Sequence, residues 1–302
     1  MPVRPLRRLQ KPTPTLYDEM TEQALHSVVW RADFAQVERE HPELILRRGT
    51  NVLAAAVVGR ATLPLAYSFA GDRDFIELFP EMFAQLLTRL RRVGAEQVRF
   101  RLMHSPSRPR VEPVLKNLWF KPSRDWLEFS IERAPAAGAH TGVRLRPAKP
   151  GEIDGIVDEI ARIDRESFPN TPMTVADLRF ALRDQQLLLA VAGRRIAGFC
   201  TYWQRDPGRG YIGTLAVSGE YRGRGIGAAL TVRAVRDLIR AGADRVGLTT
   251  DQDNTAAIRL YLKLGFRQSR AGRDYTRPTS DAQVRRQQER TRGTLIKFGG
   301  WR

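Results

Sequence analysis

The stretch Tyr221-Arg222-Gly223-Arg224-Gly225-Ile226-Gly227 decides the fold class of this 302-residue chain. It follows an expected strand, residues 211–217, and opens a segment with helical apolar spacing, residues 225–239. Glycines at such a turn let the backbone approach a bulky anion, and the free amides and positive dipole end of the helix point at that anion. By itself the stretch does not distinguish a phosphate site from a turn in which glycine serves geometry alone.

A second pattern lies downstream, in Asp251-Gln-Asp-Asn254-Thr-Ala-Ala257-Ile-Arg-Leu-Tyr261-Leu-Lys-Leu-Gly265-Phe266. Asn254 stands where a helix is expected to start, and Tyr261 follows two turns later on the same face. Together, Arg222-x-x-Gly225-x-Gly227 and Asn254-x-x-Ala257-x-x-x-Tyr261-x-x-x-Gly265-Phe266 closely resemble the GNAT superfamily of acyl-CoA-dependent N-acetyltransferases. The resemblance covers residues 143–276 in the order of the expected elements.

The resemblance implies an α/β fold with a splayed mixed sheet, acetyl-CoA bound between the fourth and fifth strands, and direct transfer of acetyl to an amine. The implied cofactor-binding residues are Leu215, Ala216, Val217, Arg222, Gly223, Arg224, Gly225, Ile226, Gly227, Ala228, Asn254 and Tyr261. Backbone groups of residues 215–217 would pair with the pantetheine arm, which Asn254 would also contact, and those of residues 222–228 would hold the pyrophosphate. Tyr261 would protonate the departing thiolate, a step worth about 10² to 10⁴ in rate.

Each of these assignments has a structural rival. Tyr261 is also suited to packing in the core, and Asn254 to serving only as a helix cap. The side chains of Arg222 and Arg224 are equally compatible with solvated charges, because the backbone amides carry most of the argument for a phosphate. Cys200 lies within an apolar strand and is expected in the core, and the sequence predicts no metal site.

The general base is the least distinct part of the pattern. We take Glu166 as the catalytic candidate, because it lies near the end of the first helix in the segment that lines the acceptor side in the family. Asp164 in the same segment and Asp251 after the fifth strand are alternatives. Each of the three is equally readable as a solvated carboxylate, in which case water would relay the proton.

The chain is expected to contain two similar domains of one fold, a tandem GNAT arrangement. The predicted parts are an extended arm at residues 1–15, a degenerate GNAT-like domain at 16–133, a linker at 134–142, a catalytic GNAT domain at 143–276 and a basic tail at 277–302. The end of the tail is apolar, which favours docking on a domain surface over a disordered end.

Internal similarity is the basis for the tandem prediction. Leu90-Arg-Arg-Val-Gly-Ala-Glu-Gln-Val98 shares five of nine residues with Leu238-Ile-Arg-Ala-Gly-Ala-Asp-Arg-Val246, at an offset of 148. Leu118-Trp-Phe-Lys-Pro-Ser-Arg124 then matches Leu264-Gly-Phe-Arg-Gln-Ser-Arg270 at an offset of 146. Two matches in the same order favour duplication over shared composition.

The first half lacks the residues that would bind a phosphate. At the offset of 148, the glycine-rich turn aligns with residues 74–79, which contain two carboxylates and no glycine. At the offset of 146, Tyr261 aligns with Leu115, and Asn254 falls near Arg108. The first domain is therefore expected to have lost its cofactor site and to brace the second domain and wall its acceptor site.

Composition restricts the other possibilities. The chain carries 50 Lys and Arg against 33 Asp and Glu, a formal charge of +17, with one cysteine and no apolar run long enough to span a membrane. A cytoplasmic protein without membrane contact is expected, because its single cysteine cannot form an internal disulfide. Nucleic-acid binding is disfavoured, because the cations are not interleaved with aromatic residues in a recognition motif.

The sequence thus predicts an acetyl-CoA-dependent N-acetyltransferase acting on a primary amine, with a small-molecule acceptor favoured over a protein. The alternative is a CoA-binding sensor or scaffold that keeps the phosphate cradle without turnover. A monomer whose halves mimic a dimer is expected, with a homodimer as the second possibility. No residue pattern selects the acceptor.

Overall fold

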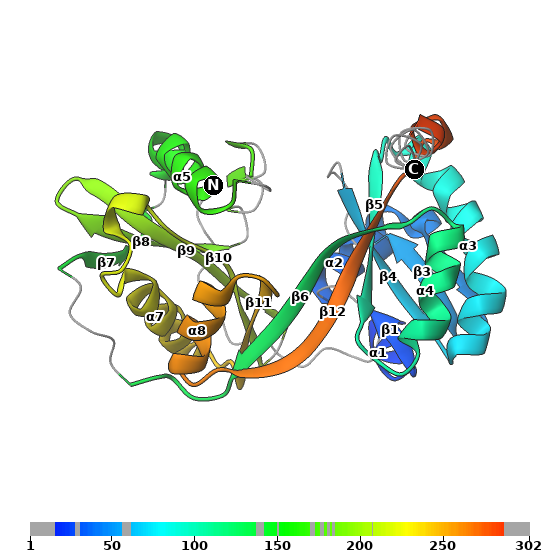
Figure 1. Cartoon of the computed structure of the whole chain (residues 1–302), viewed down its shortest axis with the longest axis horizontal. Helices are drawn as coiled ribbons and strands as arrows, with labels where there is room; N and C mark the ends of the chain where they lie inside the picture. The colour runs from blue at the N-terminus through cyan, green and yellow to red at the C-terminus, as the bar shows by residue number, and fades with distance from the viewer. Residues whose placement is uncertain are drawn as a thin grey trace, which may run out of the picture. The chain divides into compact units, whose positions relative to one another are not determined.

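The computed structural model describes residues 16–27, 31–55, 62–136, 142–149, 151–169, 173–175, 178–179, 182, 185–206 and 208–286. These residues fall into two compact units (Figure 1). The N-terminal unit consists of residues 16–126 and 270–286, and the C-terminal unit of residues 127–269. No helix in these ranges combines the length and the apolar character that crossing a bilayer requires.

The elements alternate between helices and strands in both halves of the chain. The first half contains α1 (Leu16–Thr21), β1 (Leu25–Ser27), α2 (Arg31–Glu40), η1 (Pro42–Leu44), β2 (Ile45–Arg48), β3 (Asn51–Ala55), β4 (Thr62–Phe69), α3 (Asp72–Arg92), β5 (Gln97–Met103), α4 (Arg108–Asn117) and β6 (Lys121–Ile131). The second contains β7 (Arg144–Pro147), α5 (Ile153–Ser167), β8 (Gln186–Ala192), β9 (Arg195–Asp206), β10 (Arg209–Val217), η2 (Gly219–Tyr221), α7 (Ile226–Arg240), β11 (Arg245–Asp251), α8 (Thr255–Lys263) and β12 (Arg267–Pro278). The apolar spacing of residues 175–183 also predicts a helix, and most of these residues lie outside the described ranges.

The C-terminal unit is a mixed sheet with helices on both faces. Its strands follow the order β7-β8-β9-β10-β11-β6. Because side chains alternate along a strand, β8 serves two cores: Leu188 and Ala190 pack with α7 and α8, whereas Leu187 and Leu189 pack with α5. Figure 1 shows α5 on one side of this sheet and α7 and α8 on the other. The prediction of a mixed α/β fold is confirmed.

The N-terminal unit repeats this plan. Its strands follow the order β2-β3-β4-β5-β12-β6, with β1 paired to β4. Tyr67 and Phe100 join α3 and α4 in one core, and Ala66 joins Tyr17 of α1 and Phe34 of α2 in the other. The two halves therefore have the same layers in the same order.

Two corners of the backbone repeat in detail. At the end of α3 and of α7, Gly94 and Gly242 have positive φ angles of 72° and 96°. The amides of Ala95 and Ala243 then donate to the carbonyl oxygen five residues earlier, at 3.1 and 3.0 Å. The same bond closes α4 and α8, because the amides of Phe120 and Phe266 each donate to the carbonyl five residues earlier at 3.0 Å.

One of these corners carries strain in the first half only. Gly265 after α8 has a φ of 88°, and Trp119 takes the corresponding place after α4 with a φ of 66°. A left-handed conformation costs a residue with a Cβ roughly 1–2 kcal/mol. The shared geometry, kept despite this cost, agrees with the predicted tandem fold.

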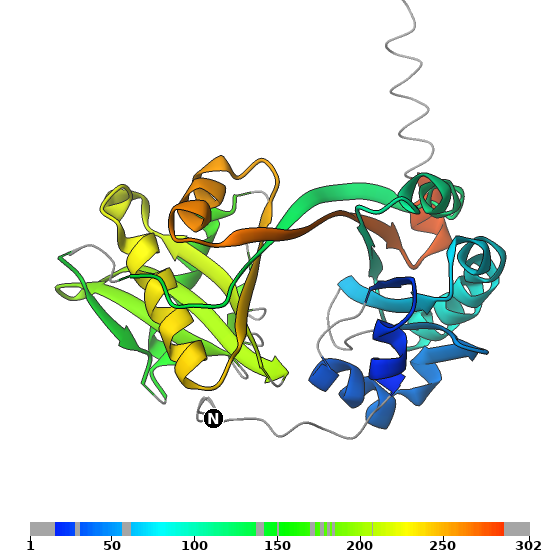
Figure 2. The ribbon, with the colours of Figure 1, turned by 90° about the horizontal axis from the view of Figure 1, so that it is seen from below.

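The last strand of each half contributes to both units (Figure 2). Residues 272–278 of β12 pair antiparallel with residues 97–103 of β5 in the N-terminal unit. The end of β6 neighbours β11 in the C-terminal unit, where Phe129 and Ile131 join the core. The predicted boundary at 134–142 divides the chain into a first and a second half. The two compact units are instead divided within β6, after Trp126, and within β12, after Ser269. Residues 137–141 of the expected linker lie outside the described residues.

The start of the predicted tail packs on the N-terminal unit. The amide of Thr279 donates to Glu96 O at 2.9 Å, and Arg277 Nε donates to Leu118 O at 2.7 Å. Val284 has an exposed fraction of 6%. The apolar end of the tail, within residues 287–302, lies outside the described residues, as does the expected arm at 1–15.

Candidate active site

The sheet of the C-terminal unit opens between β10 and β11. The two strands pair in parallel from Arg209↔Arg245 to Ile212↔Leu248. The pairing of β10 with β9 continues to Val217↔Gly198, with an irregularity between Ile212 and Leu215. Such a bulge bends a strand away from its neighbour. Along residues 215–217, the edge of β10 on the side of β11 therefore has no paired strand among the described residues.

Two amides of this edge point into the opening. The amide of Ser218 donates to Ala197 O, and that of Thr214 to Thr201 Oγ1, each at 2.9 Å, so both face β9. Because backbone groups alternate along a strand, Ala216 shares this orientation, while the amides of Leu215 and Val217 face the opposite edge. These are the positions from which a pantetheine arm could continue the sheet.

The glycine-rich turn lies at the end of the same strand. Gly223 and Gly225 have φ angles of 77° and 76°, and α7 begins at Ile226. The first turn of α7 contains no acidic residue, and no side chain of the described residues caps its amides. The amides of Ile226, Gly227 and Ala228 have no acceptor within the helix. The positive end of the α7 dipole also faces the turn. Free amides and a positive dipole end together suit the binding of a pyrophosphate.

The two arginines of the turn point their guanidinium groups at the protein. Arg222 Nε donates to Val217 O at 3.1 Å, and Arg222 also reaches the end of α5. Arg224 lies 5.3 Å from the ring centre of Tyr221 and donates to Glu220 O at 3.1 Å. The structure thus assigns the anion-binding capacity of the turn chiefly to its amides.

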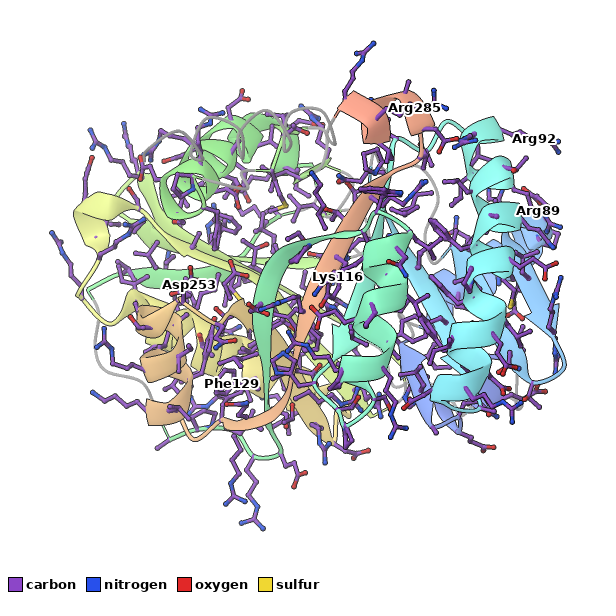
Figure 3. The ribbon with its side chains drawn as sticks, turned by 45° about the vertical axis from the view of Figure 1, so that its right-hand side comes forward. Arg89, Arg92, Lys116, Phe129, Asp253 and Arg285 are labelled. Atoms are coloured by element: carbon purple, nitrogen blue, oxygen red, sulfur yellow. The ribbon has the colours of Figure 1, made fainter. Side chains whose placement is uncertain are left out.

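Asn254 is the N-cap of α8. Its Oδ1 accepts from the amide of Ala257 at 3.1 Å. The capping role is therefore realised, and it leaves the side-chain NH₂ group as a donor. Asn254 lies in the connection between β11, which forms the other side of the opening, and α8. Figure 3 labels the neighbouring residue Asp253.

Tyr261 is buried, with an exposed fraction of 6%. Its ring centre lies 6.0 Å from that of Phe129 on β6 and 5.7 Å from that of Phe266. Figure 3 labels Phe129. Burial raises the pKa of its phenol well above the usual 10, with smaller contributions from Cys200 and Tyr211. The described residues offer its hydroxyl no hydrogen-bond partner. The protonated phenol can therefore donate a hydrogen bond to a ligand.

The three candidate bases are dispersed. Asp164 is buried, accepts from the amide of Met173 at 2.8 Å, and has a pKa raised by desolvation. Asp251 is exposed at the end of β11. Glu166 accepts from the amide of Gly219, which lowers the pKa of its carboxyl. The structure places Glu166 at the glycine-rich turn and Asp164 under the loop that follows α5.

The corresponding opening in the N-terminal unit is filled. Tyr67 on β4 stacks on Phe100 of β5 with ring centres 4.3 Å apart and donates to Arg101 O at 2.8 Å. Phe75 and Phe79 of α3 stack beside them, 4.4 Å apart. These aromatic side chains occupy the space between the separating strands.

The turn itself is shortened there. Only Ala70 and Gly71 join β4 to α3, whereas residues 218–225 join β10 to α7. The expected alignment of the glycine-rich turn with residues 74–79 was wrong, because these residues lie inside α3. The two carboxylates in the first turn of α3 are Asp72 and Asp74. Negative charge and a connection of only two residues both oppose phosphate binding at this end, so the predicted loss of the site agrees with the structure.

Comparisons with known proteins agree with this arrangement. The model of the acetyltransferase (GNAT) family matches residues 153–266. A mycothiol acetyltransferase of Pseudarthrobacter chlorophenolicus is 34% identical over 149 residues, 44% of this chain and 45% of that protein. One of Sanguibacter keddieii is 32% identical over 196 residues, 59% of this chain and 58% of that protein. The chain thus spans about half the length of the curated relatives that it matches.

Solved structures resemble the whole fold. A tandem GNAT protein from the clavulanic acid biosynthesis pathway has a TM-score of 0.61 and 16% identity, covering 87% of this chain and 93% of its own. A GCN5-related N-acetyltransferase from Sphaerobacter thermophilus has a TM-score of 0.57 and 18% identity, covering 90% and 95%. These likenesses show a shared tandem fold. Residues 153–266 thus match the GNAT acetyltransferase family, and both units together share the fold of a tandem GNAT protein.

Proposed function

We propose that this protein transfers acetyl from acetyl-CoA directly to a primary amine of a small-molecule acceptor. The observation that carries the proposal is the opening between β10 and β11. There, outward amides of one strand lie near an uncapped helix N-terminus and the hydroxyl of the buried Tyr261, which has no protein partner among the described residues. Each feature fits a different part of one ligand: the pantetheine arm, the pyrophosphate and the thioester sulfur.

The binding residues follow from this match. The backbone of Leu215 and Val217 would pair with the amides of the pantetheine arm, and the Asn254 NH₂ group would donate to it. The amides of residues 222–228 would receive the pyrophosphate, where several donors and a helix dipole act together. Ala216, whose amide faces β9, would contribute through packing.

Tyr261 supplies the proton in the proposed mechanism. The neutral amine attacks the thioester carbonyl, a carbon–nitrogen bond forms, and the carbon–sulfur bond breaks. Tyr261 donates a hydrogen bond to the developing thiolate and passes its proton to it as a thiol is released. The attacking nitrogen gives up one proton to water as the amide forms, and a proton from water restores the Tyr261 phenol. Its raised pKa keeps the phenol protonated at neutral pH, so the donor is present in every turnover. The assignment of Glu166 as the base stays a prediction, and water is the alternative acceptor of the ammonium proton.

The acceptor class is supported by the relatives. Their name, mycothiol acetyltransferase, describes a small-molecule product, which favours a small amine over a protein acceptor here. A cytoplasmic monomer whose two repeats take the place of two subunits belongs to the same proposal. Its support is the single cysteine and the exchange of the last strands.

Thiol release tests the proposal. The full chain is incubated with acetyl-CoA and a panel of small amines, including the acceptor that the relatives' name implies, and free CoA is titrated. We expect turnover with at least one amine and acetylated product by mass spectrometry. Tight acetyl-CoA binding without turnover on any amine would instead support the alternative, a CoA-binding sensor or scaffold.

A further inference from the structure

The glycine-rich turn is tied at both ends to the last turn of α5. Arg222 donates to the carbonyl oxygens of Val217 and Glu166, each at 3.1 Å. In the opposite direction, the Glu166 carboxylate accepts from Ser218 Oγ and from the amide of Gly219, both at 3.3 Å. One residue of α5 thus holds the strand end through its side chain and the turn through its backbone.

We infer that Glu166 and Arg222 are positioning residues that hold the turn in its pyrophosphate-binding conformation. The inference rests on the proposed function, because it assigns these side chains to the acetyl-CoA site. Two glycines in the left-handed region give the turn many alternative conformations when it is unrestrained. If the turn is already fixed in the free protein, ligand binding does not lose the conformational entropy of the turn. The Glu166 and Arg222 contacts should therefore lower the Kd for the cofactor.

This role makes Glu166 a weaker candidate for the general base. Its carboxylate is occupied by donors at the pyrophosphate end of the site and also pairs with Arg162 of α5. Donors that stabilise the ionised form make a carboxylate a weaker base. The lowered pKa of Glu166 agrees with that direction.

A matched control lies at the other end of the same helix. Glu152 is the N-cap residue of α5, pairs with Arg146 and accepts from the amide of Lys149 at 2.8 Å. It therefore has the same set of contacts, an arginine and a backbone amide, but none with the glycine-rich turn. Glu152→Ala removes an equivalent group from α5 without touching the cofactor site.

The experiment is isothermal titration of the full chain with acetyl-CoA. We expect Glu166→Ala and Arg222→Ala each to raise the Kd about 10-fold, and Glu152→Ala to leave it unchanged. Glu166→Gln should stay within about 3-fold of the wild type, because its amide oxygen still accepts from Gly219. The Glu166→Ala, Arg222→Ala double variant should be little worse than either single one, since both hold the same turn.

A second measurement separates positioning from a loss of folding. Hydrogen exchange of the free protein should accelerate in the peptide covering residues 218–228 of Glu166→Ala and Arg222→Ala, and not in Glu152→Ala. An unchanged Kd and unchanged exchange in both variants would overturn the inference. So would a 100-fold or greater fall in kcat of Glu166→Gln with loss of the acidic limb of its pH profile, which would identify a base. A wild-type chain that does not bind acetyl-CoA at all would instead refute the proposed function.

Discussion

The side chain of Tyr261 has one property of a core residue and one property of a ligand-binding residue. Its ring packs between Phe129 and Phe266, as a core residue would. Yet its hydroxyl has no protein partner among the described residues, whereas the buried hydroxyls of Tyr67 and Tyr275 both donate to oxygen atoms of the chain. The hydroxyl oxygen is not one of the fully buried unpartnered atoms of the described residues, so it reaches solvent. The thioester end of the cofactor would replace that solvent contact with a hydrogen bond.

Tyr261→Phe tests this at the level of one atom. We expect kcat to fall by about 10² to 10⁴, because the departing thiolate loses its proton donor. The Kd for acetyl-CoA should change little, since the arm and pyrophosphate contacts remain. Tyr202→Phe is the control, because it removes a buried hydroxyl that donates to Asp237 at 3.2 Å. Equal rates for the two variants would contradict the acid role.

The Glu152 carboxyl makes stability depend on pH. Hydrogen bonds from Arg146 lower the pKa of Glu152 from 4.5 to about 2 in the folded chain. A lowered folded-state pKa stabilises the fold above pH 4.5, and this contribution is lost as the pH falls from 4.5 towards 2. The pair is partly exposed, so it contributes no more than about 1 kcal/mol. Urea unfolding should show a smaller loss between about pH 6 and pH 3 for Glu152→Gln than for the wild type.

At the scale of elements, the two units differ most at the connection between a strand and the helix that follows it, which in the C-terminal unit is the turn of the proposed cofactor site. The same strand pair and helix occur in the N-terminal unit, but a two-residue connection leads into α3, and the Tyr67 and Phe100 rings stack where the strands separate. The proposed loss of the site there requires changes only in a loop and a few side chains, because the layers are the same. A fold of this kind provides the scaffold, and the residues of the turn are proposed to bind the ligand.

Gly223→Ala, compared with Gly193→Ala, tests whether the conformation of the glycine-rich turn matters for binding apart from the stability of the fold. Gly223 has a φ of 77°, and no atom lies within 4 Å of the place that a Cβ atom would take, so the substitution strains the backbone by roughly 1–2 kcal/mol without a clash. We expect the Kd for acetyl-CoA to rise at least about 10-fold. Gly193→Ala, in the β8–β9 turn with a φ of 60° and the same open surroundings, should cost similar stability and leave binding unchanged. Matching Kd values for the two variants would argue against this site.

At the scale of the whole molecule, the two repeats are interlocked by their last strands. Arg101 on β5 pairs with the fully buried Asp274 of β12, 173 residues away, through Nε–Oδ1 at 2.9 Å. Phe129 of β6 packs with Tyr261 in the C-terminal unit. Each unit is thus built from both halves of the chain.

Cutting the chain at an engineered protease site within residues 137–141 tests this exchange. We expect the two fragments to co-elute as one species in size-exclusion chromatography under native conditions, because each supplies a strand to the other's sheet. They should separate only in denaturant. Two peaks in native buffer would show that the repeats are independent domains joined by a linker.

Much of the second half was predictable, because its elements are bounded by local signals. Residues 211–217 were expected as a strand and 225–239 as a helix, and the structure has Arg209–Val217 and Ile226–Arg240. In the first half, α4 (Arg108–Asn117) was not anticipated. Pro109 lies in its first turn, where the missing amide has no acceptor, whereas Pro113 lies inside the helix, where proline removes a backbone hydrogen bond.

The sequence by itself determined the family resemblance, the glycine-rich turn, the helix cap and the tyrosine. These features are local: each lies within a single turn or a single helix, where the spacing along the chain fixes the relative positions of the residues. The tertiary structure decided what spacing does not encode. It showed where β10 leaves β11, that Glu166 meets Gly219 from 53 residues away, and that β6 and β12 change units. These features depend on contacts between distant segments, whose relative positions only packing of the complete fold determines.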